Sequence, residues 1–356
     1  MNCQERVVKL LNQKPIDRAP IYDLLRNDAA IEHYCQRKIT FANAAELACE
    51  ASGYILDATR PLLKYPRPDE ERVLPDGRRQ RIQRWTTWTE PFHFADAGEY
   101  ESYLRRNRIA KNYDPAVIQA EVEQSVAAHL ALTKKLGDTF LFWSCGVEVG
   151  LMTLHTEVGL DQFSYYLADC PAVIAAALES ITAASLEKIK LVYEKTKDLP
   201  ERPKAIFLGE DIAFKTATMF APPFFRAEFF PRLKRISDAC HRFGWKVMFH
   251  SDGYLMEILD DLVAAGVDVL NPIETAAKME IREIHRRHPD LILAGGIDVS
   301  GLLPFGRPSE IRDAVIRAIE DAEGRIMVGS STELHTGIPL DNVLALYDTI
   351  LEYKYS

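Results

Sequence analysis

Residues 244–274 read GWKVMFHSDGYLMEILDDLVAAGVDVLNPIE, in which an apolar run, a helical pattern and a second apolar run follow one another. The apolar runs cover residues 246–250 and 267–272, and residues 255–265 between them carry apolar side chains at helical spacing. Short strands that are apolar throughout are typical of a parallel sheet covered on both faces. This stretch therefore predicts one β–α–β unit.

The same alternation of short apolar runs and longer helical patterns extends over the rest of the chain. Helical patterns cover residues 171–195, 223–243, 278–288 and 308–322. The predicted strands are residues 19–24, 54–58, 139–144, 204–209, 246–250, 267–272, 291–297 and 325–329. Eight strands joined by helices close most naturally into a (β/α)8 TIM barrel, which is an α/β fold. We expect this barrel to form a single domain that spans residues 1–356. A doubly wound open sheet is the alternative, but the Gly-rich phosphate turn after its first strand is missing.

Two segments add to the predicted barrel. The first 20 residues form an amphipathic pattern and predict an N-terminal helix. Residues 71–94 contain the turn dipeptide Asp76-Gly77 between alternating residues, which predicts a β-hairpin inserted near the barrel mouth. The Arg and Trp residues of this hairpin are interpreted as a solvated face backed by packed aromatic rings, or alternatively as a lid on an anionic or aromatic ligand.

Composition excludes several functions. The 356 residues include 43 Lys and Arg against 52 Asp and Glu, a net charge of -9, so binding of nucleic acid or of an anionic membrane is not expected. No apolar stretch approaches the about 20 residues that span a bilayer. The six cysteines form no CxxC pair, which favours reduced thiols and a cytoplasmic protein.

Candidate functional residues follow from the place where barrel enzymes keep their reactive groups, at the C-terminal ends of the strands. A carboxylate or an imidazole follows almost every predicted strand. Each of these residues alone is more simply a helix cap, but so many acidic groups on one rim repel each other unless a cation offsets them. The candidates at these positions are Arg26, Asp57, Glu148, Glu210, Asp211, His250, Asp252, Glu274, Asp298, Glu333 and His335.

The most informative spacing is His250-Ser251-Asp252. Residues two apart in an extended strand point the same way, so the imidazole and the carboxylate can hold one ion. Zinc usually takes three or four ligands, and Glu210, Asp211, Glu274 or Glu333 can supply the others. Oxygen-rich ligands with one His suit Zn, Fe or Mn. The alternative is a His250 that hydrogen-bonds a neighbouring carboxylate and binds no metal.

Several longer motifs resemble the uroporphyrinogen decarboxylase superfamily over nearly the whole chain. They are RAPIYDLLRND (18–28), GEDIAF (209–214), FAPPFFRAEFFPRLKRISDACHRFGWKVMFHSDG (220–253), GVDVLNPIE (266–274), GGIDVSGLLPFG (295–306) and GSSTELHTGIPLDNVLALYD (329–348). This superfamily contains the decarboxylase of haem synthesis and methyltransferases that move methyl groups to or from corrinoid proteins. The resemblance implies a (β/α)8 barrel, in agreement with the strand pattern.

Of these two branches, the decarboxylases are the poorer match. Their N-terminal RQAGR pattern is RNDAA here, which keeps Arg26 and loses a second substrate-binding Arg. Asp57 stands where decarboxylases keep the Asp that binds pyrrole NH groups. The methyltransferases hold zinc with His-x-Cys and a late Cys, whereas this chain has His250-x-Asp252 and, near the late position, Glu333.

The resemblance therefore implies a zinc-assisted methyltransferase that acts between a small methylated substrate and a corrinoid protein. The predicted metal ligands are His250, Asp252 and Glu333. The predicted catalytic residues are Asp57, Glu210, Asp211 and Glu274, and the predicted substrate-binding residues are Arg26, Asp57, Glu148, Asp298 and His335. A decarboxylase for a tetrapyrrole or a smaller carboxylated substrate, and a non-catalytic corrinoid- or tetrapyrrole-binding protein, stay as alternatives. A homodimer is left open.

Overall fold

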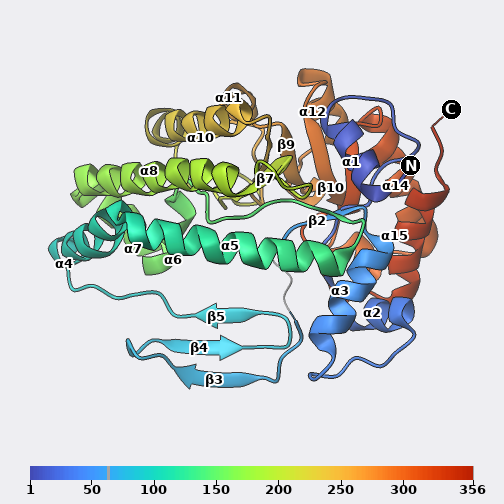
Figure 1. Ribbon diagram of the computed structural model, residues 1–356, viewed down its shortest axis with the longest axis horizontal. Helices are drawn as coiled ribbons and strands as arrows, with labels where there is room; N and C mark the ends of the chain where they lie inside the picture. Colours follow the sequence, from blue (N-terminus) through green and yellow to red (C-terminus); the bar gives the residue numbers. More distant parts are fainter. Residues whose placement is uncertain (62–64, 356) are drawn as a thin grey trace.

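The computed structural model describes residues 1–61 and 65–355 (Figure 1). Five parallel strands form the largest sheet, in the order β11-β10-β9-β8-β7. Single parallel bridges close this sheet into a ring: Ile21 pairs with Val328 of β11, Tyr22 pairs with Ala58 of β2, and Trp143 pairs with Ile206 of β7. Strands β2 and β6 pair with each other and complete the wall. The predicted (β/α)8 barrel is confirmed, and each of the eight predicted runs supplies one position of its wall.

The bounds of the strands and helices are as follows. The strands of the wall are β2 (Ala58–Thr59), β6 (Phe140–Leu141), β7 (Ala205–Gly209), β8 (Lys246–His250), β9 (Val269–Ile273), β10 (Ile292–Ile297) and β11 (Ile326–Ser330), and β1 (Leu25–Arg26) pairs with β12 (Leu334–His335) beyond them. The helices before β7 are α1 (Cys3–Leu11), α2 (Asp28–Cys35), α3 (Ala44–Ile55), α4 (Ala97–Leu104), α5 (Pro115–Leu136), α6 (Leu151–Val158), α7 (Leu160–Asp169) and α8 (Pro171–Thr196), with η1 (Arg105–Ala110) and η2 (Lys111–Tyr113) between α4 and α5. Those after β7 are α9 (Pro222–Phe224), η3 (Phe225–Phe229), α10 (Phe230–Arg242), α11 (Leu259–Ala264), η4 (Thr275–Ala277), α12 (Ile281–Arg287), α13 (Leu302–Phe305), α14 (Pro308–Asp321) and α15 (Leu340–Glu352).

The barrel interior is filled by side chains that alternate along each strand. Phe207 of β7, Met248 of β8 and Met327 of β11 belong to this inner cluster, whereas their immediate neighbours pack outward against the helices. Helix α1 closes the N-terminal end of the barrel, because Val7 and Leu10 join the same cluster. The predicted N-terminal helix therefore acts as a plug, and the C-terminal ends of the strands remain as the open end.

The inserted segment has three strands where a two-stranded hairpin was predicted. Strands β3 (Glu70–Val73), β4 (Arg79–Ile82) and β5 (Thr87–Thr89) form a three-stranded antiparallel sheet, which lies below α5 in Figure 1. The predicted turn at Asp76-Gly77 connects β3 and β4, and Gly77 has a φ of 86° that favours glycine. Arg84 and Trp85 both donate hydrogen bonds to Asp28 at the start of α2, so the sheet is attached near the end of the first strand.

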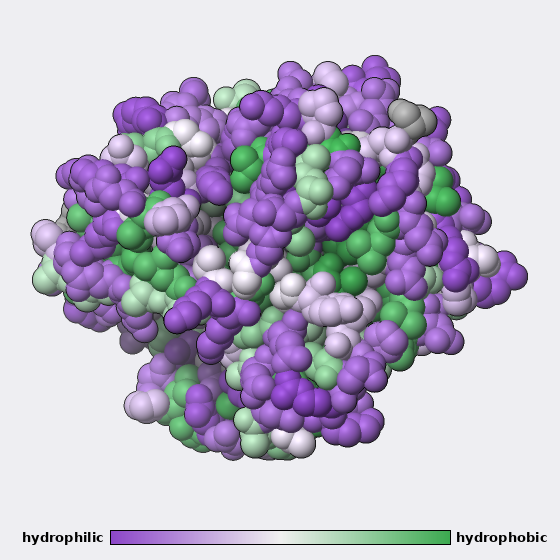
Figure 2. Space-filling view, turned by 45° about the vertical axis from the view of Figure 1, so that its right-hand side comes forward, coloured by the Kyte–Doolittle hydropathy of each residue, from purple (hydrophilic) through white to green (hydrophobic). Residues whose placement is uncertain are grey.

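The surface and the helices bear on whether the chain has what a membrane-spanning protein would need. Figure 2 shows a face on which hydrophilic residues dominate, with hydrophobic patches between them. Among the described residues, no single helix is long and apolar enough to cross a membrane; only α7 and α8 together reach the required length and composition, and they are bent by 112°.

Candidate active site at the open end of the barrel

Three predicted residues come together at the C-terminal ends of β7 and β8. One ligand atom from each of Asp211, His250 and Asp252 lies within 4.8 Å of the other two. Side chains two residues apart in a strand point to the same face. Phe207 and Met248 point into the barrel, so Asp211, His250 and Asp252, which lie two or four residues further on, point inward as well. Within the described part of the chain, no other group of three or more His, Cys, Asp or Glu side chains is gathered in this way.

The hydrogen bonds of His250 favour metal binding through one ring nitrogen. Nδ1 lies 2.7 Å from Oδ1 of Asn271, whose Nδ2 donates to the carbonyl of Ala294 and so fixes the orientation of the amide. Nδ1 must therefore carry the proton and donate it to Oδ1, which leaves a lone pair on Nε2. Nε2 lies 3.9 Å from Oδ1 of Asp211, too far for a hydrogen bond.

The electrostatics keep this imidazole neutral. The side chain is buried, with 7% of the residue exposed. Burial lowers the pKa of His250 well below its usual value, the Arg60 guanidinium lowers it further, and the hydrogen bond to Asn271 opposes both. A neutral imidazole with a free Nε2 is the form that binds a metal ion.

The two carboxylates of the cluster are held by neighbouring groups. Oδ1 of Asp252 accepts a hydrogen bond of 2.9 Å from the Thr332 hydroxyl, and Oδ1 of Asp211 accepts one of 3.1 Å from the Asp252 backbone N–H. Burial raises the pKa of Asp252 to about 6; Asp211 and Glu274 also raise it, while Thr332 and Arg60 lower it. A bound cation would offset the repulsion between these carboxylates and the cost of burying their charge. The donor set of one imidazole and two carboxylates therefore fits a divalent metal.

Glu274 lies at the edge of this cluster. Its Oε2 accepts a hydrogen bond of 2.8 Å from the Gly253 N–H, and its Oε1 is 3.9 Å from the Lys215 ammonium. The structure therefore brings this predicted catalytic residue close to the three candidate ligands.

Glu333 is not part of the cluster. Its carboxylate forms an ion pair with Arg26, because β12 runs beside β1 and Leu334 pairs with Leu25. The third residue beside His250 and Asp252 is Asp211 instead. Arg26, predicted to bind substrate, and Glu333, predicted to bind the metal, thus form an ion pair with each other.

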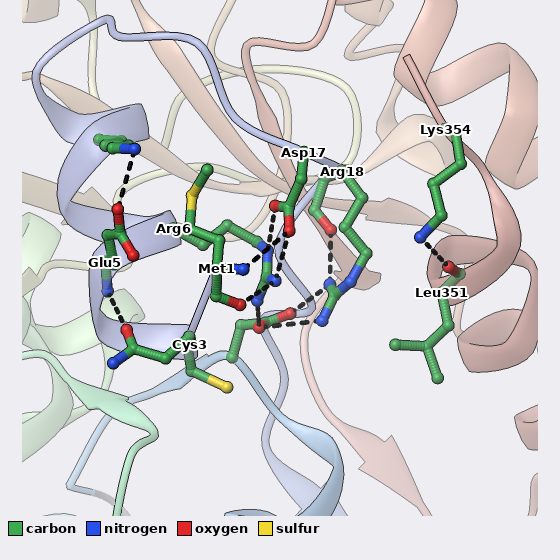
Figure 3. Close-up of polar contacts among 12 residues, drawn as sticks. Met1, Cys3, Glu5, Arg6, Asp17, Arg18, Leu351 and Lys354 are labelled. Carbon is green, nitrogen blue, oxygen red and sulfur yellow. Dashed lines mark hydrogen bonds and ion pairs between the residues drawn. The ribbon is translucent and has the colours of Figure 1, made fainter.

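Asp57 lies apart from this cluster, at the plugged end of the barrel. Arg6 and Arg18 donate to its two oxygens at 2.5–3.1 Å, and the backbone N–H of Ile21 donates at 2.8 Å. Figure 3 shows these arginines beside Asp17 at the start of the chain. Asp57 is fully buried. It connects α1 to the barrel wall through its ion pair with Arg6.

Glu210 points outward from the barrel toward helix α6. Its oxygens accept hydrogen bonds from the N–H groups of Gly150 and Met152, at 2.6 and 2.8 Å. Burial raises the pKa of Glu210 to about 8, the nearby Glu148 also raises it, and these backbone hydrogen bonds oppose the rise. Both oxygens are used in holding α6 to the barrel.

The remaining predicted substrate-binding residues have local partners. Glu148 accepts a hydrogen bond from the Thr153 hydroxyl. Asp298 accepts hydrogen bonds from the N–H groups of residues 300–302, at the start of α13. His335 contacts the Val299 carbonyl through Nε2 at 3.2 Å. None of the three belongs to the cluster at His250.

The candidate residues predicted from the sequence include neither Arg60 nor Asn271. Both point into the barrel by the same alternation, Arg60 two residues after Ala58 and Asn271 two residues after Val269. The parity of the strands was the signal that could have found them.

The fold and the site together define a (β/α)8 barrel with a candidate metal centre at its open end. The family model for uroporphyrinogen decarboxylase (URO-D) matches residues 114–353, about two thirds of the chain. The chain belongs to this family, as its motifs predicted, and the superfamily is one of enzymes. A solved structure of a methyltransferase from Methanosarcina mazei is similar, with a TM-score of 0.67, 18% identity and 99% of each chain covered, which shows the shared fold. No curated protein matches the sequence.

Proposed function

We propose that this protein is a zinc-assisted methyltransferase that moves a methyl group between a small methylated substrate and a corrinoid protein. The observation that carries the proposal is the convergence of Asp211, His250 and Asp252 within 4.8 Å at the open end of the barrel. One imidazole and two carboxylates match the three protein ligands of a catalytic zinc site, which keeps a further position for substrate.

The proposed ligand set is Nε2 of His250 with the carboxylates of Asp211 and Asp252. Zinc bound there would act as a Lewis acid that lowers the pKa of an acceptor group or polarises the heteroatom that leaves the methyl group. Carboxylate ligands in place of thiolates make the site less thiophilic, so an oxygen or nitrogen atom is the favoured partner of the transferred methyl group.

The surrounding side chains position these ligands. Asn271 holds the His250 proton on Nδ1, and Thr332 orients the Asp252 carboxylate. Such partners of metal ligands fix the tautomer and the orientation of the ligating groups. Glu274, held by the Gly253 N–H beside the cluster, is the proposed residue that accepts or donates a proton at the substrate heteroatom.

The first test is metal content. Purified protein loaded with zinc and then dialysed should keep about one zinc per chain, whereas His250→Ala and Asp211→Asn should lose most of it. Glu333→Gln is the matched control, because its carboxylate pairs with Arg26, and it should keep the wild-type content. Wild-type protein without stoichiometric metal, or a His250→Ala variant with the same content, would overturn the proposal.

The second test is the reaction. Zinc-loaded protein should form methylcobalamin from reduced cobalamin and a small methylated donor, and His250→Ala should not. The decarboxylase alternative needs Asp57 at the substrate, but two arginines already hold that carboxylate. Formation of coproporphyrinogen from uroporphyrinogen at an enzymatic rate would favour that alternative. Tight corrinoid binding that survives the loss of His250, without any turnover, would favour a non-catalytic binding protein.

A further inference from the structure

Arg60 lies inside the barrel, next to the candidate metal site. It follows β2 and has the same parity as the inward-facing Ala58, and only 5% of its surface is exposed. Its guanidinium carbon lies 4.4 Å from the centre of the Phe207 ring. The ring of His250 is 5.5 Å from the same ring. Arg60 and His250 therefore border the same part of the barrel interior.

Apart from its contact with the Phe207 ring, this guanidinium has no hydrogen-bond or carboxylate partner among the described residues. Its Nε atom is buried without a hydrogen bond, and no carboxylate of the described residues lies within ion-pair distance of it. The other arginines deep in the fold, Arg6 and Arg26, both have carboxylate partners. A buried arginine is rare unless it is paired, because the charge loses its hydration. The N–H donors of the Arg60 guanidinium are thus not used by any hydrogen bond within the described part of the chain.

Tyr22 provides a second unused donor in the same region. The backbone of Tyr22 pairs with that of Ala58, its neighbour in the barrel wall. The Tyr22 side chain belongs to the inner cluster, and 3% of the residue is exposed. The hydroxyl is buried and has no hydrogen-bond partner. The charge of Arg60 acts on Tyr22, since it opposes the rise in the pKa of Tyr22 that burial causes. A guanidinium and a hydroxyl, both buried and unused, are complementary to one oxyanion.

We propose that Arg60 and Tyr22 bind a carboxylate of the substrate, so that the small methylated substrate is an acid and not an amine or a neutral ether. A planar guanidinium forms two parallel hydrogen bonds with a carboxylate, which a single charge such as lysine does not reproduce. Phe207, whose ring contacts the Arg60 guanidinium, supplies an apolar surface for the substrate. The methylated heteroatom at the other end of the molecule then faces His250 and its neighbours. For this last point the inference rests on the proposed function.

The test compares carboxylates with their neutral amides. The probes are methoxyacetate with methoxyacetamide and 4-methoxybenzoate with 4-methoxybenzamide, titrated calorimetrically into the zinc-loaded protein. Wild type should bind at least one acid about tenfold or more tightly than its amide. Arg60→Gln should lose this preference, Arg60→Lys should lose most of it, and Tyr22→Phe should weaken the acid several-fold with the amide unchanged. Arg79→Gln, which alters an exposed arginine of β4, is the matched control and should bind as wild type does.

The outcomes separate this inference from the proposed function. Equal binding of acid and amide by wild type, no binding of either acid, or a preference that persists in Arg60→Gln would overturn the carboxylate site, whatever the zinc content. Wild-type protein that prefers the acids but holds no zinc would overturn the metal site and leave the carboxylate site standing. If Arg60→Gln does not fold, Arg60→Lys and Tyr22→Phe decide the result, because lysine keeps the charge of the arginine and phenylalanine keeps the ring of the tyrosine.

Discussion

The hydrogen bond between His250 and Asn271 gives the most direct prediction about the proposed metal site. Asn271→Leu keeps the approximate size of the side chain and removes the Oδ1 acceptor that lies 2.7 Å from Nδ1. The ring can then carry its proton on either nitrogen, and the tautomer with a proton on Nε2 cannot bind a metal ion. We expect the zinc affinity to fall while the three ligands stay in place.

The size of the effect follows from the role of such partners. Loss of a hydrogen bond to a metal-ligating histidine typically costs about 10- to 100-fold in metal affinity, or about 1.4–2.8 kcal/mol. The buried Nδ1–H group, left without an acceptor, costs a further about 1–3 kcal/mol of folding stability in the metal-free protein.

Competition with a chromogenic zinc chelator measures the affinity, and urea denaturation of the metal-free protein measures the stability. Asn271→Asp is the control, because its carboxylate still accepts the Nδ1 proton and should retain wild-type affinity or exceed it. An Asn271→Leu variant that binds zinc as tightly as wild type would refute the assigned tautomer. Equal losses in Asn271→Leu and Asn271→Asp would show that packing, and not the acceptor, is responsible.

Four further changes have defined outcomes. Asp57→Asn removes the counter-charge that the buried Arg6 and the partly buried Arg18 share, and should lower the free energy of unfolding by about 3–5 kcal/mol with zinc content unchanged, as denaturation and metal analysis would show. Zinc affinity should fall as the pH drops below about 6, because Asp252, whose pKa is raised to about 6, must lose its proton to bind the ion; a titration from pH 7 to pH 5 checks this, and a flat profile would contradict it. Asp28→Ala removes both hydrogen bonds that attach the β3–β5 sheet to α2, so hydrogen exchange should speed up in residues 70–89 and not in the barrel. Gly253→Ala should destabilise the protein by about 1–3 kcal/mol, measurable by thermal unfolding, because the residue has a φ of 96° and the new Cβ would lie 2.8 Å from the Ala213 carbonyl oxygen.

The sequence by itself determined the barrel and two of the three residues of the candidate metal site. Continuous apolar runs separated by helical patterns specify buried parallel strands locally, and eight of them have few ways to close. The spacing of His250 and Asp252 placed both side chains on one face, because the period of a strand is fixed by its backbone. The turn at Asp76-Gly77 was also predictable, since its conformation depends on the residues of the turn itself.

The tertiary structure decided which strand ends meet. Asp211, and not Glu333, joins His250 because β7 and β8 are neighbours in the sheet, whereas the pairing of β12 with β1 sets Glu333 against Arg26. Asp57 is taken up by arginines from the first 18 residues, which no local pattern connects to it. Contacts between residues far apart in sequence depend on the register and closure of the whole barrel, and the burial of Arg60 without a counter-charge becomes visible only once that closure is known.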